Sequence, residues 1–207
     1  MDVAKQVLIG ADFSGQELRG ATFNLTNLRD ATFAGSDLQG ASLFGAKLQD
    51  ADLVHADLRD ADLRQAQLQR ANLGQARLDG AQLSGANLSF TSLTGASLRG
   101  ADLRGALLDG TDLRQADLSG ALLDPGALSR SHWQQAKGVN QEQLSFVELH
   151  NAGVEASMQG RHSEAEGYFN AAIRREPAAA ISWVARGITR GQQGQAEMAA
   201  KDFSYAA

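Results

Sequence analysis

A large apolar residue recurs at every fifth position along most of this chain. From Leu8 to Trp133, twenty-six positions in register carry leucine or phenylalanine and, at the last position, tryptophan. A period of five fits neither the 3.6-residue turn of an α-helix nor the two-residue alternation of a β-strand. The chain must therefore fold into an object that repeats its own geometry every five residues.

A small residue, usually alanine, stands two positions before most of these large residues, as in ADLVHADLRDADLRQ at residues 51–65. Residues two apart in extended chain point to the same side, so both face inward and the residue between them faces outward. The next alanine follows three residues later, so the chain must turn a corner. Glycine fills many corners, where a positive φ angle costs it little. Asp, Gln or Arg stands at other corners, and some of these turns are predicted to be of another type.

The resulting A-[DN]-L-x-x pattern, as in ADLRDADLRQ and ANLGQARLDG, resembles the pentapeptide-repeat family. The resemblance implies a mainly β solenoid, a right-handed quadrilateral β-helix of about six coils over residues 6–135, with four pentapeptides in each coil. It also suggests a cyanobacterial source. In such a coil Phe13 and Phe33 would stack on one face and Phe23 would pack opposite, closing the N-terminal end. Trp133 would close the other end.

After about Asn140 helical spacing and a second, longer repeat replace the five-residue period. Each member of this helical repeat has a counterpart at one constant spacing further along the chain. The first series is Leu149, Gly153, Gly160, Ala165, Phe169 and Ala172. The second, in the same order, is Trp183, Gly187, Gly194, Ala199, Phe203 and Ala206. With Pro177, this series resembles the tetratricopeptide (TPR) pattern. The resemblance implies an α-helical TPR-like segment at 146–207, made of two repeats, 146–179 and an incomplete 180–207. Residues 136–145 would be a linker or the start of the first helix.

Two details of this segment extend the prediction. Ser163 and Glu166 have the spacing of a capping box that opens a helix. Two TPR-type repeats bury little core alone, since about three are usually needed. Either the helices lean on the end of the β-helix, or the chain is a piece of a longer TPR-containing protein.

Candidate catalytic and metal-binding residues do not converge. The four histidines, His55, His132, His150 and His162, lack the partners at ligand spacing that a metal site needs. Six candidate aspartates fall in the outward slot of the repeat, where local hydrogen bonds to turn backbone explain them: Asp52, Asp57, Asp62, Asp102, Asp112 and Asp117. We find no phosphate loop or serine elbow. The sequence therefore predicts no enzyme activity, no metal and no cofactor.

The charge balance bears on the partner. The chain has a net charge of −5, which gives no support for nucleic acid binding. Some pentapeptide-repeat proteins resemble DNA in shape and charge and bind gyrase or another topoisomerase through an acidic β-helix surface, and this is the alternative function. However, residues 1–137 hold 16 acidic and 13 basic residues, so arginines interrupt the negative field. These arginines, which share faces of the coil, either pair with aspartates or form a partner-binding stripe: Arg19, Arg59 and Arg99 on one face, Arg64 and Arg104 on another.

The favoured function is a non-enzymatic protein–protein interaction scaffold, a rigid β-helical rod joined to partner-binding helices. The predicted partner-binding residues, taken as outward-facing, are Asn151, Glu155, Arg186 and Arg190, with His150 and Glu148 as weaker candidates. A protein partner would bind through these helices or a β-helix face. The protein would be a monomer or a weak dimer through exposed strand edges at its N-terminal end.

The remaining sequence features concern location. The stretch MDVAKQVLIGADF contains no apolar leader segment, and no run of 18 apolar residues could span a membrane. We therefore expect a cytoplasmic protein with no membrane partner, although a processed mature form would look the same. The absence of cysteine excludes disulfides without choosing a compartment.

Overall fold

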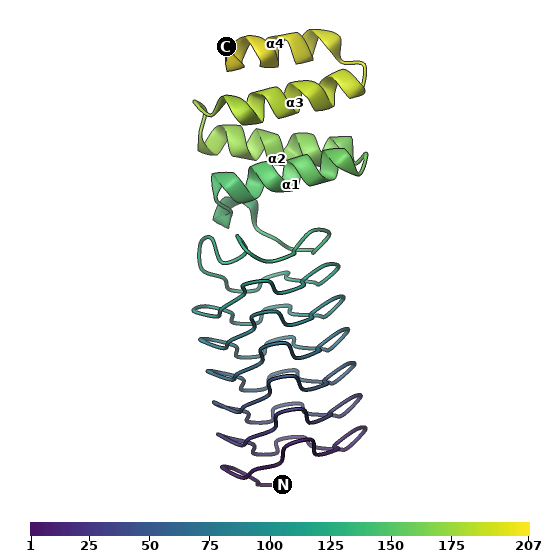
Figure 1. Cartoon of the computed structure of the whole chain (residues 1–207), viewed down its shortest axis with the longest axis vertical. Helices are drawn as coiled ribbons and strands as arrows, with labels where there is room; N and C mark the ends of the chain where they lie inside the picture. Colours follow the sequence, from purple (N-terminus) through teal and green to yellow (C-terminus); the bar gives the residue numbers. More distant parts are fainter. The chain divides into compact units, whose positions relative to one another are not determined.

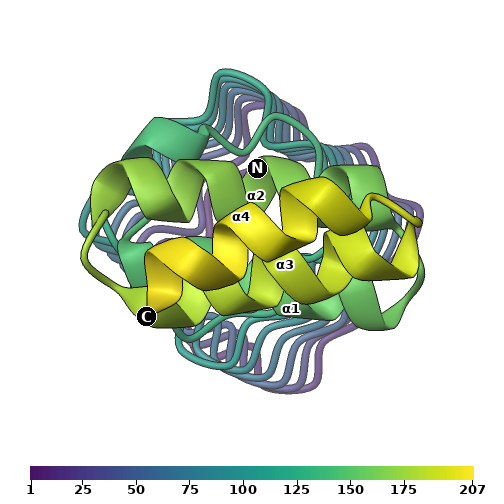
Figure 2. The ribbon, with the colours of Figure 1, turned by 90° about the horizontal axis from the view of Figure 1, so that it is seen from above.

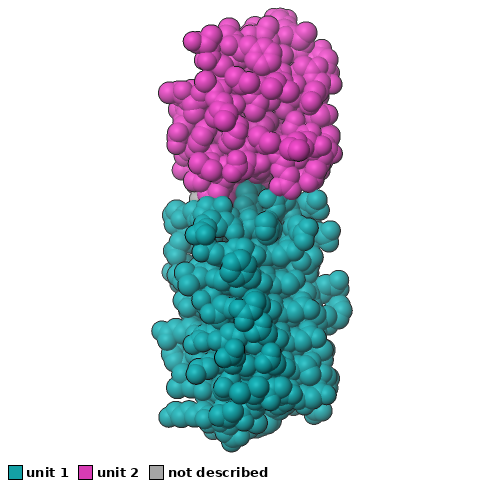
Figure 3. All heavy atoms as spheres, viewed as in Figure 1, with its two compact units in different colours: residues 1–139 teal, residues 140–207 magenta. Residues whose placement is uncertain are grey.

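The computed structural model describes residues 1–142 and 144–207 in full. The chain divides into two compact units, residues 1–139 and 140–207 (Figure 3). The first unit contains the five-residue repeats, and the second contains the helices.

In the first unit, residues twenty apart lie side by side in successive coils (Figures 1 and 2). The outward residue between the inward alanine and leucine forms a parallel β-bridge with its counterpart in the next coil. These bridges run from Asp2 and Thr22 to Asp117 and Lys137. Bridges recur every five residues, which gives the 20-residue coil four sides. Each side contributes one bridging residue instead of a long strand. Right-handed coiling stays a prediction from the sequence resemblance.

Corners with and without glycine use the same left-handed backbone. The φ angle is 60° at Gly45, 62° at Asp50 and 61° at Phe90. The prediction of another turn type at the non-glycine corners is therefore wrong. The ladder between coils explains why: the corner N–H donates to a carbonyl nineteen residues later, at 2.9 Å from Gly45 to Arg64 and at 3.1 Å from Asp50 to Gln69. This regular hydrogen bonding holds a conformation that costs a non-glycine residue about 1–2 kcal/mol.

The interior of the coils is packed by the alanines and leucines of the repeat, nearly all of them fully buried. Each buried leucine side chain contributes roughly 1.5–3 kcal/mol relative to an exposed one. Threonine replaces the inward alanine at a few places and remains hydrogen-bonded. The hydroxyls of Thr91 and Thr111 donate to the carbonyls of Leu68 and Leu88 at 2.7 and 2.8 Å. A buried hydroxyl with a partner avoids the desolvation penalty of an unpaired one.

Aromatic residues pack at both ends of the repeat region. The rings of Phe13 and Phe33 stack with centroids 4.9 Å apart, and Phe23 meets each of them edge-on at 5.6 Å. This arrangement confirms the predicted aromatic cluster near the N-terminus. Trp133 is buried in the last coil, where bridging continues to Lys137.

The second unit begins with a short 3₁₀ helix, η1. Its elements are η1 (Gln141–Gln143), α1 (Phe146–Met158), α2 (His162–Arg175), α3 (Ala180–Gln192) and α4 (Ala196–Ala206). The capping box lies at the start of α1: the Ser145 side chain accepts from the Glu148 N–H, and the Glu148 carboxylate accepts from the Ser145 N–H. The capping box predicted at Ser163 and Glu166 is wrong, because α2 starts at His162 and has no side-chain cap.

The four helices form two hairpins, α1 with α2 and α3 with α4, that follow the helical repeat of the sequence (Figure 1). Gly160 and Gly194 turn the two hairpins with φ angles of 74° and 77°. Inside each hairpin a glycine lets a phenylalanine ring approach the helix backbone. A Cβ atom on Gly153 would lie 2.5 Å from the Phe169 ring, and one on Gly187 would lie 2.7 Å from the Phe203 ring.

Candidate protein-binding face

The predicted binding residues on α1 lie at or near the surface. Asn151 is exposed. Glu155 is half-buried, and its carboxylate accepts a hydrogen bond from the Gln159 side chain at 3.1 Å. Both residues can therefore meet a partner that approaches α1.

The two predicted residues on α3 have a different environment. Arg190 is only 9% exposed, and its guanidinium pairs with Asp202 at 3.0 Å and with Glu166 at 2.8 Å. Arg186 donates to both Asp202 oxygens, at 2.6 and 3.0 Å, and also to the Asn170 side chain. The prediction that Arg190 faces outward is therefore wrong. The guanidinium of Arg186 is likewise held by hydrogen bonds within the helical unit.

The helical repeat explains this burial. Residues four apart lie on one face of a helix, and in α3 this face packs toward α2 and α4, where Glu166 and Asp202 provide the carboxylates. The equivalent positions of the first repeat are Ala152 and Ala156, which are buried. The alignment of the two helical repeats was the signal in the sequence that would have placed the arginines correctly.

The weaker candidates, His150 and Glu148, are also buried instead of presented to a partner. Glu148 caps α1. The Nδ1 atom of His150 lies 2.9 Å from the Ser182 hydroxyl on α3, and its ring packs beside Phe146 and Phe169. Burial lowers the pKa of the His150 imidazole. Glu148 therefore stabilises the start of α1, and His150 links α1 to α3.

A face that the sequence analysis missed runs along α1 and α3. On α1, Val147, Val154 and Met158 follow helical spacing, and Met158 is 83% exposed. On α3, Ile181 and Ile188 occupy the positions of the second helical repeat that correspond to Val147 and Val154, and both are exposed. The spacing of aliphatic residues in α1 and α3 was the signal for this face, since such a stripe predicts an apolar helix face.

The two stripes meet at a hollow of about 240 Å³. Val154, Met158, Ala185 and Ile188 line it together with Phe169. We call the surface formed by Val147, Val154, Met158, Ile181, Ala185 and Ile188 the α1/α3 face. It offers apolar contacts and a cavity for a side chain, which are features of a protein-binding surface.

The outward slots of the coils carry a different chemistry. The Asp57 carboxylate accepts from the Arg59 N–H two residues on and pairs with the guanidinium groups of Arg59 and Arg77. The same turn recurs at Asp112, where the Arg114 side chain and N–H lower the pKa of the carboxyl to about 2. The structural interpretation of the repeat aspartates is therefore confirmed at these positions, and ion pairs divide the negative charge of the rod.

This 20-residue coil and its aspartate turns agree with the comparison of the sequence with known families. The model for pentapeptide repeats matches residues 7–43, 41–80 and 81–120 in eight copies, which covers more than half of the chain. The chain belongs to the pentapeptide-repeat family.

Solved pentapeptide-repeat structures show similarity to this chain. One from the Arabidopsis thaliana thylakoid lumen is 38% identical, with a TM-score of 0.38, and the match covers 54% of this chain and 67% of that one. Trypsin-treated QnrB1, a plasmid-mediated fluoroquinolone resistance protein, is 21% identical (TM-score 0.42; 73% and 86% covered). HetL, involved in heterocyst differentiation regulation in the cyanobacterium Nostoc, is 26% identical (TM-score 0.26; 66% and 84% covered). No curated protein matches the chain.

Across residues 1–142 and 144–207, no three His, Cys, Asp or Glu side chains cluster in a way that could hold a metal ion. Within the same described residues, no helix has the length and apolar character to cross a membrane.

Proposed function

We propose that this pentapeptide-repeat protein is a non-enzymatic scaffold whose TPR-like helices bind a protein partner through the α1/α3 face. The observation that carries the proposal is the exposed aliphatic stripe on both helices, with the hollow between them. A soluble protein gains nothing in stability from leaving such a stripe in water. An amphipathic helix of a partner, with apolar residues at helical spacing, fits a surface of this kind.

The repeat of the helical unit supports this assignment. The aliphatic positions of α1 and α3 correspond in the two helical repeats, as do the glycine–phenylalanine contacts inside the two hairpins. Stacked helix pairs of this kind present successive first helices on one surface. The pentapeptide rod then acts as a rigid support.

The experiment compares two matched variants as bait in the lysate of the native organism. Ile188→Glu places a charge on the α1/α3 face, and Ile9→Glu places one on the rod, at a side chain of similar exposure. A partner held by the wild type and by Ile9→Glu, but lost by Ile188→Glu, supports the proposal. The direct interaction is then measured by calorimetry with the purified partner. Equal capture by all three baits contradicts it.

The alternative function is a DNA mimic that binds gyrase through the rod. The pairing of Asp57 and Asp112 with neighbouring arginines weighs against it, because a mimic needs a continuous negative field. We expect the protein to leave gyrase supercoiling activity unchanged even in molar excess. Inhibition that is relieved by replacing rod aspartates with asparagine would favour the mimic.

A further inference from the structure

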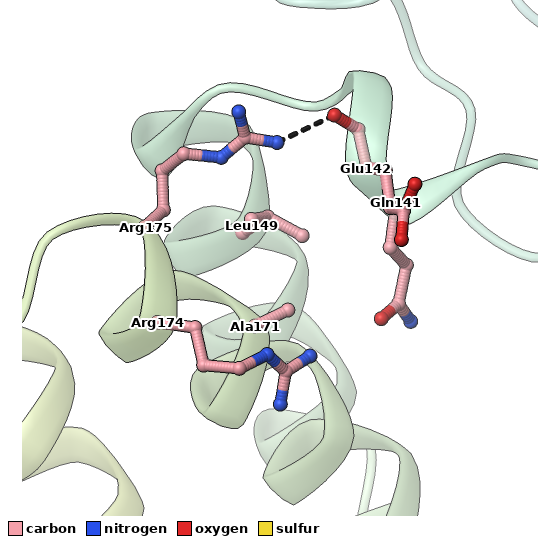
Figure 4. A pocket seen from close by; sticks show the side chains of 6 residues that line it. All are labelled: Gln141, Glu142, Leu149, Ala171, Arg174 and Arg175. Carbon is pink, nitrogen blue, oxygen red and sulfur yellow. Dashed lines mark hydrogen bonds between the residues drawn. The ribbon is translucent and has the colours of Figure 1, made fainter.

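A second hollow lies within the helical unit, away from the α1/α3 face. It has a volume of about 420 Å³ and is formed by η1, α1 and α2 (Figure 4). Gln141 and Glu142 line one side, Arg174 and Arg175 line the other, and Leu149 and Ala171 lie between them. Leu149 and Ala171 are buried, whereas the four polar residues are exposed. The hollow therefore combines a small apolar floor with a polar, cationic rim.

One of the two arginines builds the hollow. An Nη of Arg175 donates to the main-chain carbonyl of Glu142 at 2.6 Å, which ties η1 to the end of α2 (Figure 4). Asn140 supports the same segment, because its side chain accepts from the Glu142 N–H at 2.9 Å. These bonds fix the distance between the two walls, and they account for the position of Arg175.

The other arginine has no such role. Across the described part of the chain, the Arg174 guanidinium makes no hydrogen bond and no ion pair, although it lines the hollow beside Ala171. Its charge complements the carbonyl end of α2, as any cation in a last turn does. This interaction leaves the planar donor groups of the guanidinium available, and they match the two oxygens of a carboxylate.

We propose that this hollow binds a small monocarboxylate with a short aliphatic chain. The carboxylate pairs with Arg174, and the aliphatic chain lies over Leu149 and Ala171. The volume falls within the range of small-molecule sites. The Glu142 carboxylate belongs to the same rim and repels a second negative charge, so the site favours a monoanion over inorganic phosphate.

The test uses the full chain, labelled for NMR, and three probes. Pentanoate carries both the carboxylate and the chain, pentanamide carries the chain without charge, and inorganic phosphate carries charge without the chain. We expect pentanoate to shift the Leu149 methyl and Arg174 Nε–Hε resonances in a saturable way. Pentanamide and phosphate should bind several-fold more weakly. Arg174→Gln should weaken pentanoate binding about tenfold, because a charge-assisted bidentate pair is lost.

Three further variants sharpen the result. Arg99→Gln makes the same charge change on the rod and should leave pentanoate binding unchanged. Glu142→Gln should tighten binding a few-fold by removing the repulsion at the rim. Arg174→Lys keeps the positive charge but lacks the planar donor groups, so its affinity for pentanoate should lie between those of the wild type and Arg174→Gln. Such an intermediate affinity would also show that the weaker binding of Arg174→Gln does not come from a folding defect.

Clear results would overturn the proposal. Equal effects of pentanoate and pentanamide would show that the carboxylate is not recognised. Tighter binding of phosphate than of pentanoate would show a simple anion site without a role for the floor. Equal affinity of Arg174→Gln and Arg99→Gln for pentanoate would show that Arg174 does not take part in binding.

Discussion

Each unit contains an aspartate between two arginines, and the two clusters differ in burial. In the rod, Asp57 pairs with Arg59 and Arg77 on the surface of the coils. In the helical unit, Asp202 pairs with Arg186 and Arg190 and is only 1% exposed. The rod is held by its backbone ladder and its apolar interior, and its Asp57 lies half-buried at the coil surface, where an ion pair adds little to stability. The helical unit instead builds ionic groups into its packing, where an unpaired charge is costly.

The largest expected effect on stability comes from breaking the buried cluster around Asp202. Asp202→Ala leaves two arginines buried without this carboxylate and should lower the free energy of unfolding by about 3–5 kcal/mol. Asp57→Ala removes the half-buried counterpart at the coil surface and should cost less, about 1 kcal/mol. Urea unfolding followed by circular dichroism at 222 nm measures both. Similar losses in the two variants would contradict the contrast between the units.

The next effect concerns the glycines under the two phenylalanines. Gly153→Ala forces a methyl group against Phe169, which is buried, and should destabilise the protein by about 1–3 kcal/mol. Gly187→Ala should cost less, because Phe203 is 44% exposed and its ring can move. Thermal melts compare the two variants.

Gly167→Ala is the matched control for these substitutions. A Cβ atom there meets nothing within 4 Å, and alanine favours a helix by up to about 1 kcal/mol relative to glycine. This variant should be neutral or more stable. A loss as large as that of Gly153→Ala would show that ring contact is not the cause.

A smaller effect is expected at the corners of the rod. Gly100→Ala introduces a side chain at a φ angle of 66° with open space around it, and should cost about 1 kcal/mol. Gly110→Ala adds a contact, because its Cβ would lie 2.6 Å from the Phe90 ring. We expect a greater loss for Gly110→Ala in chemical unfolding. Equal losses would mean that the exposed Phe90 ring moves aside freely.

The smallest expected effect is the pH dependence of the free energy of unfolding, which should differ between the two units. Burial lowers the pKa of His150 in the folded protein, so the unfolded chain takes up this proton first as the pH falls below about 6.5. The free energy of unfolding should therefore decrease with acidification in that range. His150→Val, which places the residue found at the equivalent position 184, should flatten this dependence.

The aspartates of the rod act at lower pH. The folded pKa of Asp112 is about 2, below its ordinary value of 3.8, so its contribution is present above pH 3.8 and is lost as the pH falls through 2. When the free energy of unfolding is measured from pH 7 down to pH 2, the contribution of His150 should decline before that of Asp112. Loss of both contributions at one pH would contradict this order.

The prediction of the rod succeeded because one local rule repeats. The inward places of alanine and leucine, the aromatic cluster around Phe23 and the aspartate turns all follow from the five-residue spacing. The corner geometry was predicted wrongly at residues such as Asp50, because residue preference suggested another turn where the ladder between coils dictates the conformation.

The helical unit was predicted less well, for a related reason. Charge alone suggested that Arg186 and Arg190 face a partner. Their burial depends on carboxylates that α2 and α4 bring to them from 16 and 24 residues away. The hollow beside Arg174 likewise depends on η1 lying against α2, a contact that no local pattern encodes.

By itself, the sequence determined the family, the coil repeat and the inward residues of the rod, because a period repeated many times leaves the backbone one regular solution. Only the tertiary structure decided which charges are buried, where the apolar stripe of α1 and α3 is exposed and where the walls of the hollow stand. These features arise from side chains that are distant in sequence and meet only when the helices pack.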